Sequence, residues 1–251
     1  MAGEWKVIVS FLDNRLKFDN KSLSCLLEKC SEEFVVISVV GNVRKSELMS
    51  CIVNHVSLIP SGAVVALWSE PVTVMYRGQP MSLLFMDTSA MDEPTQQYED
   101  IDRFVLGFTC ALSSRLLYCV HRQVTSKDWL LMFKSCFIFG AEVVRLNRPL
   151  LLVTDWSASL LEKEKYAKRL TDSLVHGYGM NGRKLLQLFG GNSIDVTLLP
   201  SPNELTLNGG FKECVKSVIS SVLESDDLTI FRRNCYLDQC KKVVESFTIA
   251  L

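Results

Sequence analysis

Short apolar runs of strand length recur along the chain, and they constrain its fold more than any other feature. Each run is nearly continuous rather than alternating, which is the pattern of strands that are buried on both faces of a sheet. Seven runs have this character: Trp5 to Phe11, Phe34 to Val40, Ala63 to Trp68, Ser82 to Met86, Leu116 to Val120, Leu150 to Val153, and Val196 to Leu199. Such strands need a layer of structure on each side.

Helix-like stretches lie between these runs and provide that cover. They are Ser46 to Val56, Asp100 to Ser113, Ser126 to Phe139, Leu160 to Leu174, Phe211 to Leu223 and a terminal helix, Leu237 to Phe247. Strand and helix in alternation predict a three-layer α/β fold with a mostly parallel sheet. With 251 residues and no convincing linker, we expect one domain over residues 1–251.

Two glycine-containing segments indicate connections. Arg77-Gly78, between Met75 and Gln79, is typical of a hairpin turn and predicts an antiparallel pair at an edge of the sheet. The segment from His176 to Gly191 is rich in glycine and is expected to contain a mobile loop.

Composition excludes several classes of protein. The formal net charge of -1 provides no general basic field for nucleic acid or an anionic membrane, so such a partner would need a local patch. Nine cysteines without a CxxC pair favour neither zinc nor a disulfide framework, and they indicate the cytosol or nucleus. No apolar run reaches the roughly 18 to 20 residues of a membrane span, so we expect a membrane anchor only in a segment outside this chain.

A glycine turn followed by a Lys-Ser pair joins the second apolar run to the next helix, in the order Gly41, Arg44, Lys45, Ser46. Backbone N–H groups at such a helix start can hold phosphates, while Lys and Ser meet the terminal phosphate and Mg²⁺. The working pattern is GxxxxGK[ST], and here two positions and the second glycine are missing. The same letters also fit a plain turn before a helix with an exposed lysine.

Two further strands end in an aspartate. Asp87 follows a hydrophobic run, where GTPases hold Mg²⁺ through water, but Ala90 replaces the glycine of a DxxG pattern. Asp155 follows Thr154 and offers a carboxylate to the donors of a guanine. Either aspartate also fits a simple helix cap or loop residue.

The order and spacing of these stretches resemble the atlastin and guanylate-binding-protein branch of the dynamin superfamily, with atlastins the most similar. Four other segments carry the same resemblance: Leu67-Trp-Ser-Glu-Pro, Leu112-Ser-Ser-Arg-Leu-Leu-Tyr, Leu198-Leu-Pro-Ser-Pro and Ser225-Asp-Asp-Leu. The resemblance extends from about Trp5 to the end of the chain and implies a P-loop GTPase-like G domain.

The resemblance also implies roles for individual residues. Arg44 matches the arginine that swings in as an internal arginine finger, and Lys45 and Ser46 match the phosphate-binding lysine and the Mg²⁺ ligand. The family's guanine-reading Arg-Asp pair is Thr154-Asp155 here, so the arginine is lost. Before the WSEP strand the chain has Ser61-Gly62 and no clear switch threonine.

These losses weaken one activity, and they predict a pseudo-GTPase that acts as a protein-interaction or dimerisation module. A divergent GTP-binding GTPase of the atlastin type, acting in membrane remodelling, is the alternative; it would use GTP and Mg²⁺ and would lie at the endoplasmic reticulum surface if an anchor follows. In the first case, Lys45→Ala is expected to leave stability nearly unchanged, and a homodimer or heteromer surface is expected near Met91 and Tyr98.

Overall fold

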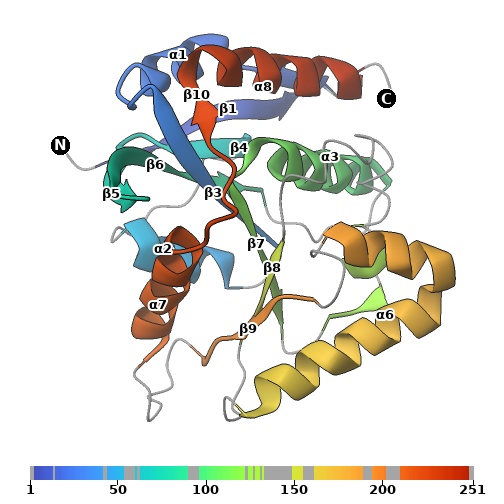
Figure 1. Ribbon diagram of the computed structural model, residues 1–251. Helices are drawn as coiled ribbons and strands as arrows, with labels where there is room; N and C mark the ends of the chain where they lie inside the picture. The colour runs from blue at the N-terminus through green and yellow to red at the C-terminus, as the bar shows by residue number, and fades with distance from the viewer. Residues whose placement is uncertain are drawn as a thin grey trace.

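The residues that the structure describes form a ten-stranded sheet with helices on both faces (Figure 1). The structure is a computed structural model that describes residues 3–13, 15–41, 44–53, 60, 63–89, 96–121, 124–126, 128–130, 132, 149–154, 161–188, 194–201 and 210–248. The strand order is β2-β1-β4-β6-β3-β7-β8-β9, with β5 beside β6 and β10 beside β3. The strands are β1 (Trp5–Leu12), β2 (Arg15–Phe18), β3 (Glu33–Gly41), β4 (Ala63–Trp68), β5 (Val72–Tyr76), β6 (Gln79–Thr88), β7 (Arg115–His121), β8 (Leu150–Thr154), β9 (Val196–Leu198) and β10 (Phe231–Arg232).

Five adjacent strands, β6-β3-β7-β8-β9, run parallel and form the centre of the sheet. Counted along the chain, their spatial order is second, first, third, fourth, fifth, which is one of the two common doubly wound arrangements. The order reverses between β3 and β7. In such sheets the crevice beyond the carboxyl ends of the strands at this reversal is the preferred ligand site, so the topology directs attention to the end of β3.

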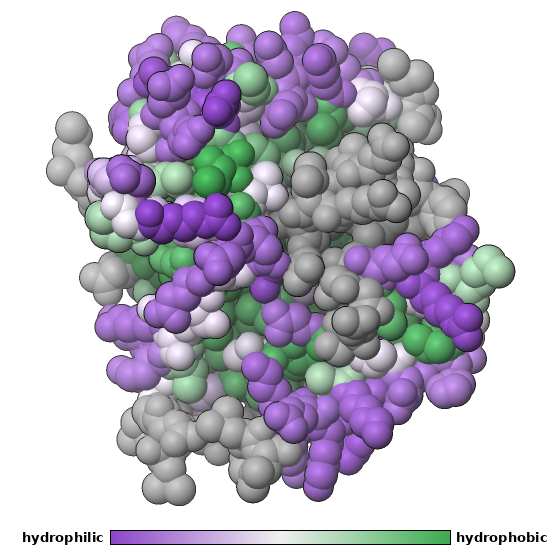
Figure 2. Space-filling view, viewed as in Figure 1, coloured by the Kyte–Doolittle hydropathy of each residue, from purple (hydrophilic) through white to green (hydrophobic). Residues whose placement is uncertain are grey.

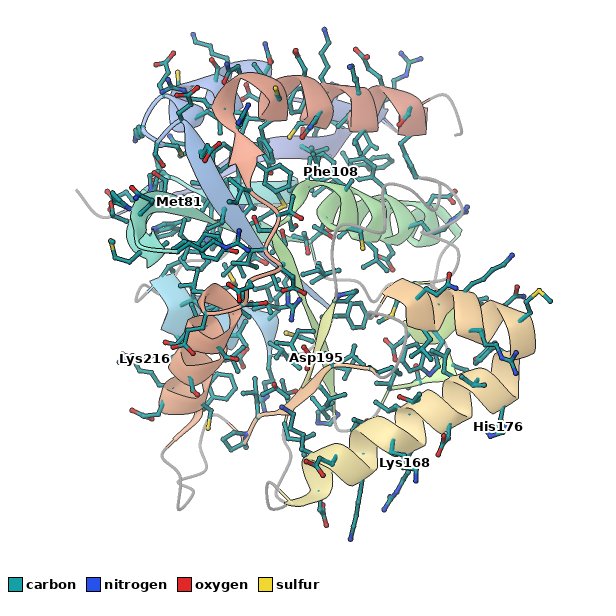
Figure 3. All side chains as sticks on the ribbon, viewed as in Figure 1. Met81, Phe108, Lys168, His176, Asp195 and Lys216 are labelled. Carbon is teal, nitrogen blue, oxygen red and sulfur yellow. The ribbon has the colours of Figure 1, made fainter. Side chains whose placement is uncertain are left out.

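Helices bury two separate apolar clusters, one on each face. Helices α2 (Lys45–Val53) and α7 (Phe211–Leu223) cover the face that includes Met81, while α1 (Asn20–Leu27), α3 (Gln96–Leu112), α6 (Leu161–Leu188) and α8 (Arg233–Thr248) cover the face that includes Phe108 (Figure 3). Hydrophilic side chains lie over the outer surfaces of α6 and α8 (Figure 2). This confirms the predicted three-layer α/β class with its mostly parallel sheet.

All seven apolar runs are strands, and the hairpin at Arg77-Gly78 joins β5 to β6 in antiparallel pairing, as predicted. The terminal helix is also present as α8. The strand β2 and the helix α1 were not predicted. Most of the helix expected over Ser126 to Phe139 lies outside the described residues.

The mobile loop expected within His176 to Gly191 is wrong for the described residues, because α6 continues to Leu188, and residues 189–191 lie outside them. Its glycines instead build a corner between two helical segments. Gly179 has a φ of 54°, which interrupts the helix, and a Cβ on Gly182 would lie 2.0 Å from the carbonyl oxygen of Leu174. Glycine here allows close backbone contact rather than a loop.

Helix α8 is attached to the core through a buried tyrosine. The ring of Tyr236 lies edge-on to Phe34 and Phe231, and its hydroxyl donates a 2.8 Å hydrogen bond to the carbonyl of Leu112 at the end of α3. Tyr236 is fully buried, so no water can replace this donor without rearrangement.

We therefore expect Tyr236→Phe to lower the free energy of unfolding by about 1–3 kcal/mol, the cost of a buried acceptor left without its donor. Urea unfolding followed by circular dichroism measures the change. Tyr178→Phe is the matched control, because Tyr178 is 38% exposed on α6. Equal effects of the two substitutions would show that the bond to Leu112 does not stabilise the fold.

Candidate functional site

The end of β3 lies against β7 so closely that only glycine fits there. Gly41 has a φ of 128°, and a Cβ at this position would lie 2.2 Å from the carbonyl oxygen of Cys119. Residues 42–43 are outside the described chain, and α2 begins at Lys45. The glycine that sequence analysis assigned to a phosphate-binding turn therefore has a structural role at the junction of β3 and β7.

Lys45 is buried, with 7% of its surface exposed, and contacts the end of β6. Its Nζ lies 3.2 Å from Oδ1 of Asp87, donates to the carbonyl of Thr88, and lies 3.5 Å from the Thr88 hydroxyl. An ammonium group has three donors, and these three oxygens supply partners for them. The interpretation of this segment as a plain turn with an exposed lysine is therefore wrong.

Asp87 is buried as well, with 4% of its surface exposed, because β6 lies directly beside β3 with Val39 and Asp87 in register. Its Oδ1 also accepts a 2.8 Å hydrogen bond from the N–H of Thr88. Burial raises the pKa of this carboxyl, while the charge of Lys45 acts in the opposite direction. The Thr88 hydroxyl donates to the carbonyl of Val39 at 3.4 Å. These contacts join α2, β3 and β6.

Cys119 completes this buried group from the neighbouring strand, β7. Its thiol is fully buried, and burial raises its pKa to about 12. The thiol is therefore protonated at neutral pH and does not act as a nucleophile.

Arg44 and Ser46 flank Lys45, and each contacts a residue of α2. An Arg44 guanidinium nitrogen lies 3.0 Å from Oε1 of Glu47, and the Ser46 carbonyl accepts a 2.7 Å hydrogen bond from the Ser50 hydroxyl. The φ of Arg44 is 57°, a conformation that costs a residue other than glycine about 1–2 kcal/mol. The side chain of Arg44 is partly exposed at the N-terminus of α2.

The predicted guanine site is described only in part. Thr154 is buried at the end of β8, and its hydroxyl donates to the carbonyl of Val120 at 3.2 Å, which ties β8 to β7. Asp155, Ala90 and Met91 lie outside the described residues. Tyr98 belongs to α3, but its side chain is not among those described. The roles proposed for these residues stay predictions.

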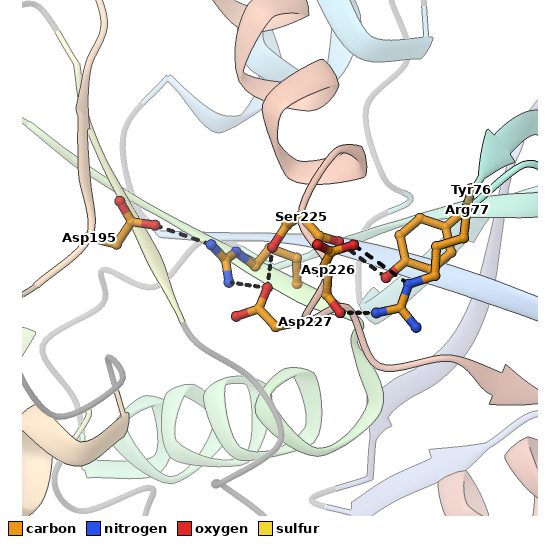
Figure 4. A network of polar contacts seen from close by, with 7 residues as sticks. Tyr76, Arg77, Asp195, Ser225, Asp226 and Asp227 are labelled. Carbon is orange, nitrogen blue, oxygen red and sulfur yellow. Dashed lines mark hydrogen bonds and ion pairs between the residues drawn. The ribbon is translucent and has the colours of Figure 1, made fainter.

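A second group of polar side chains lies at the amino ends of the parallel strands, opposite Lys45 and Asp87. Sequence analysis assigned no site there. Arg115 begins β7, and its guanidinium lies 3.1 Å from Asp195 and 3.9 Å from Asp227 (Figure 4). The Ser225 hydroxyl donates to Asp227, and the Ser225 carbonyl accepts from the Tyr76 hydroxyl at 3.1 Å. The network joins β5, β7, the start of β9 and the segment after α7, so its role is structural.

Sequence reasoning missed Thr88, Cys119 and Arg115. A signal existed only for the last, because Arg115 lies in Leu112-Ser-Ser-Arg-Leu-Leu-Tyr and its partner Asp227 lies in Ser225-Asp-Asp-Leu, and both segments resemble those of atlastins. Thr88 and Cys119 are ordinary strand residues in the sequence, and only the parallel pairing of β6, β3 and β7 brings them beside Lys45.

Comparison with known proteins assigns no family to this chain. No family model matches the chain. No curated protein matches it either. Among solved structures, one match is a variant of Aquifex aeolicus Era bound to GDP.AlF4-, with 12% sequence identity, a TM-score of 0.42, and coverage of 78% of this chain. The chain covers 57% of that structure. A likeness at this level assigns neither a family nor an activity.

In the described part of the chain, no helix is both long and apolar enough to span a membrane.

Proposed function

We propose that this chain is a pseudo-GTPase, a G-domain-like fold that acts through protein contacts rather than nucleotide chemistry. The observation that supports it is the position of Lys45, whose ammonium group is buried against Asp87 and Thr88. A phosphate-binding lysine has to present its charge to the β- and γ-phosphates, and here that charge neutralises a buried carboxylate.

The cost of moving Lys45 argues against nucleotide binding. If the ammonium group turned toward a phosphate, Asp87 would be left ionised and unpaired in the interior, which costs about 3–5 kcal/mol. Four kcal/mol corresponds to a loss of roughly a thousandfold in affinity. The shortened turn after Gly41 also lacks two positions and the second glycine of a working phosphate loop. The residues as arranged therefore do not fit GTP with Mg²⁺.

The alternative is a divergent GTP-binding GTPase of the atlastin type that remodels membranes. It is favoured by one observation: Lys45 and Ser46 begin α2, directly after Arg44, at the reversal of strand order, where doubly wound sheets bind ligands. This alternative requires Lys45 to leave Asp87, so it carries the energetic cost given above.

Titration of the purified chain with fluorescent GTP and GDP in Mg²⁺ separates the two functions. We expect no saturable binding up to roughly 1 mM nucleotide, the upper end of ordinary enzyme affinities for substrates. Saturation at micromolar concentration that depends on Mg²⁺ would contradict the pseudo-GTPase proposal.

Phosphate release from GTP provides the second measurement, with Arg44→Ala as the test variant. If Arg44 were an arginine finger, its removal would reduce hydrolysis by about 10³-fold or more. We expect the same background rate for the variant and the unaltered chain. An active GTPase measured in parallel shows that the assay detects turnover.

A further inference from the structure

We infer that the outer edge of β5 is a self-association surface, at which two copies of the chain pair their sheets antiparallel about a two-fold axis. The inference deepens the proposed interaction function, because it names the partner as a second copy. It names β5 as the contact, whereas sequence analysis expected the surface near Met91 and Tyr98.

The backbone of β5 has one edge paired and one edge open. It pairs with β6 through a two-residue turn, in which Arg77 and Gly78 have φ values of 49° and 77°, as a type I′ turn requires. No strand of the described chain pairs with its other edge. In Figure 1, β5 lies at the left margin of the molecule.

The turn determines which backbone groups face outward. The pair that closes a two-residue hairpin, Tyr76 with Gln79, exchanges hydrogen bonds, and such pairs alternate along antiparallel strands. The N–H and C=O groups of Thr73 and Met75 therefore point away from β6. Pro80, which has no N–H, lies opposite Met75 and agrees with this assignment.

The exposed side chains of β5 differ from those of the edge strand β2. Strand β2 carries Arg15 and Lys17, charges of the kind that discourage edge-to-edge pairing. Strand β5 has the sequence VTVMY without any charge, and Val72 and Met75 are 45% and 64% exposed. An uncharged, apolar open edge is a template for another strand.

Self-complementarity selects a second copy as the occupant. Backbone groups that face outward on one copy have to pair with outward-facing groups on the other. With the two-fold axis centred on Val74, Thr73 of each copy lies opposite Met75 of the other, which gives two such pairs. This register forms four backbone hydrogen bonds. A shift that centres the axis on Thr73 would place Met75 opposite Pro71, which has no N–H to donate. A shift the other way would pair Thr73 with Arg77 of the turn.

The residues flanking the edge also suit an antiparallel copy. Glu70 precedes the strand and Arg77 follows it, so the pairing brings opposite charges to neighbouring positions at each end. A parallel arrangement would instead place like charges together. The net charge of -1 adds little repulsion between copies.

Molar mass by light scattering, measured without nucleotide at micromolar concentration, tests the inference. We expect a mass twice the 28.3 kDa of one chain. The double substitution Thr73→Lys with Met75→Lys sets like charges directly opposite each other and should give monomers, as should Thr73→Glu with Met75→Glu. Mixing the two variants should restore a dimer that contains one chain of each kind.

Two controls keep the result specific. Thr73→Val with Met75→Leu leaves the edge uncharged and should remain dimeric, and circular dichroism should show that every variant is folded. A monomeric unaltered chain, a lysine variant that stays dimeric, or charge variants that do not pair when mixed would each overturn the inference. The nucleotide titration is independent, so a chain that bound GTP but paired through β5 would refute only the pseudo-GTPase proposal.

Discussion

Lys45→Ala is expected to lower the free energy of unfolding by about 3–5 kcal/mol, the range for removing one partner of a buried ion pair. The sequence predicted almost no effect, because it placed this lysine on the surface. In the structure the substitution leaves Asp87, only 4% exposed, without the cation that neutralises it, and leaves the Thr88 carbonyl without a donor.

Urea unfolding at several pH values measures this effect and its cause. Burial raises the pKa of Asp87 above its unfolded value, so its contribution to stability is present at low pH and lost as pH rises. Without Lys45 the pKa rises further. The deficit of Lys45→Ala should therefore be largest at neutral pH and should shrink as the solution is acidified.

Replacing both partners is the matched control. Lys45→Met with Asp87→Leu removes both charges and keeps apolar volume, so it should recover most of the lost stability. Lys184→Ala on the exposed surface of α6 should change stability by no more than about 0.5 kcal/mol. A deficit of Lys45→Ala that equals that of Lys184→Ala, or that does not vary with pH, would contradict the buried pair.

Gly41→Ala is the second substitution with a large expected effect, a loss of roughly 2–6 kcal/mol of unfolding free energy. Backbone strain at a φ of 128° and overpacking against the Cys119 carbonyl each contribute about 1–3 kcal/mol. The obstacle is backbone rather than a flexible side chain, so β3 and β7 would have to separate where they are held by parallel pairing.

Gly78→Ala separates the two causes of that loss. Gly78 also has a positive φ, 77°, but a Cβ there meets nothing within 4 Å. Its substitution should cost only the conformational part, about 1–2 kcal/mol. Thermal or urea unfolding of both variants measures the two losses of stability. Equal losses would show that the close contact between Gly41 and the Cys119 carbonyl does not exclude a Cβ.

Much of the fold could be predicted because its strands are buried on both faces and so are continuously apolar. The continuous apolar pattern alone was enough to predict strands β3, β6, β7 and β8. Strand β2, with the sequence RLKF, alternates and is short, which gave no comparable signal. The glycines of α6 misled for another reason: composition indicates a loop, while Gly182 is needed for contact with the Leu174 carbonyl.

Sequence analysis named some residues of the buried group around Lys45 but not the contacts that they make. Sequence placed Gly41, Lys45 and Asp87 at strand and helix ends, and the structure puts them at one edge of the sheet. Whether Lys45 faces solvent or Asp87 depends on contacts 43 residues away along the chain, at Thr88, and periodicity carries no information on such distances.

The pairing of β10 with β3 has a consequence for how the chain is made. Arg232 and Glu33, which are bonded across this pair, are 199 residues apart in the sequence. The aromatic rings of Phe231 and Tyr236, which pack against Phe34, belong to the same late segment. During synthesis, at roughly 5–20 residues per second, the apolar strand β3 leaves the ribosome long before these partners exist. Until β10 is made, the part of the β3 edge at Glu33 and Phe34 is open to other chains, so yield in cells should depend on chaperones that shield nascent strands.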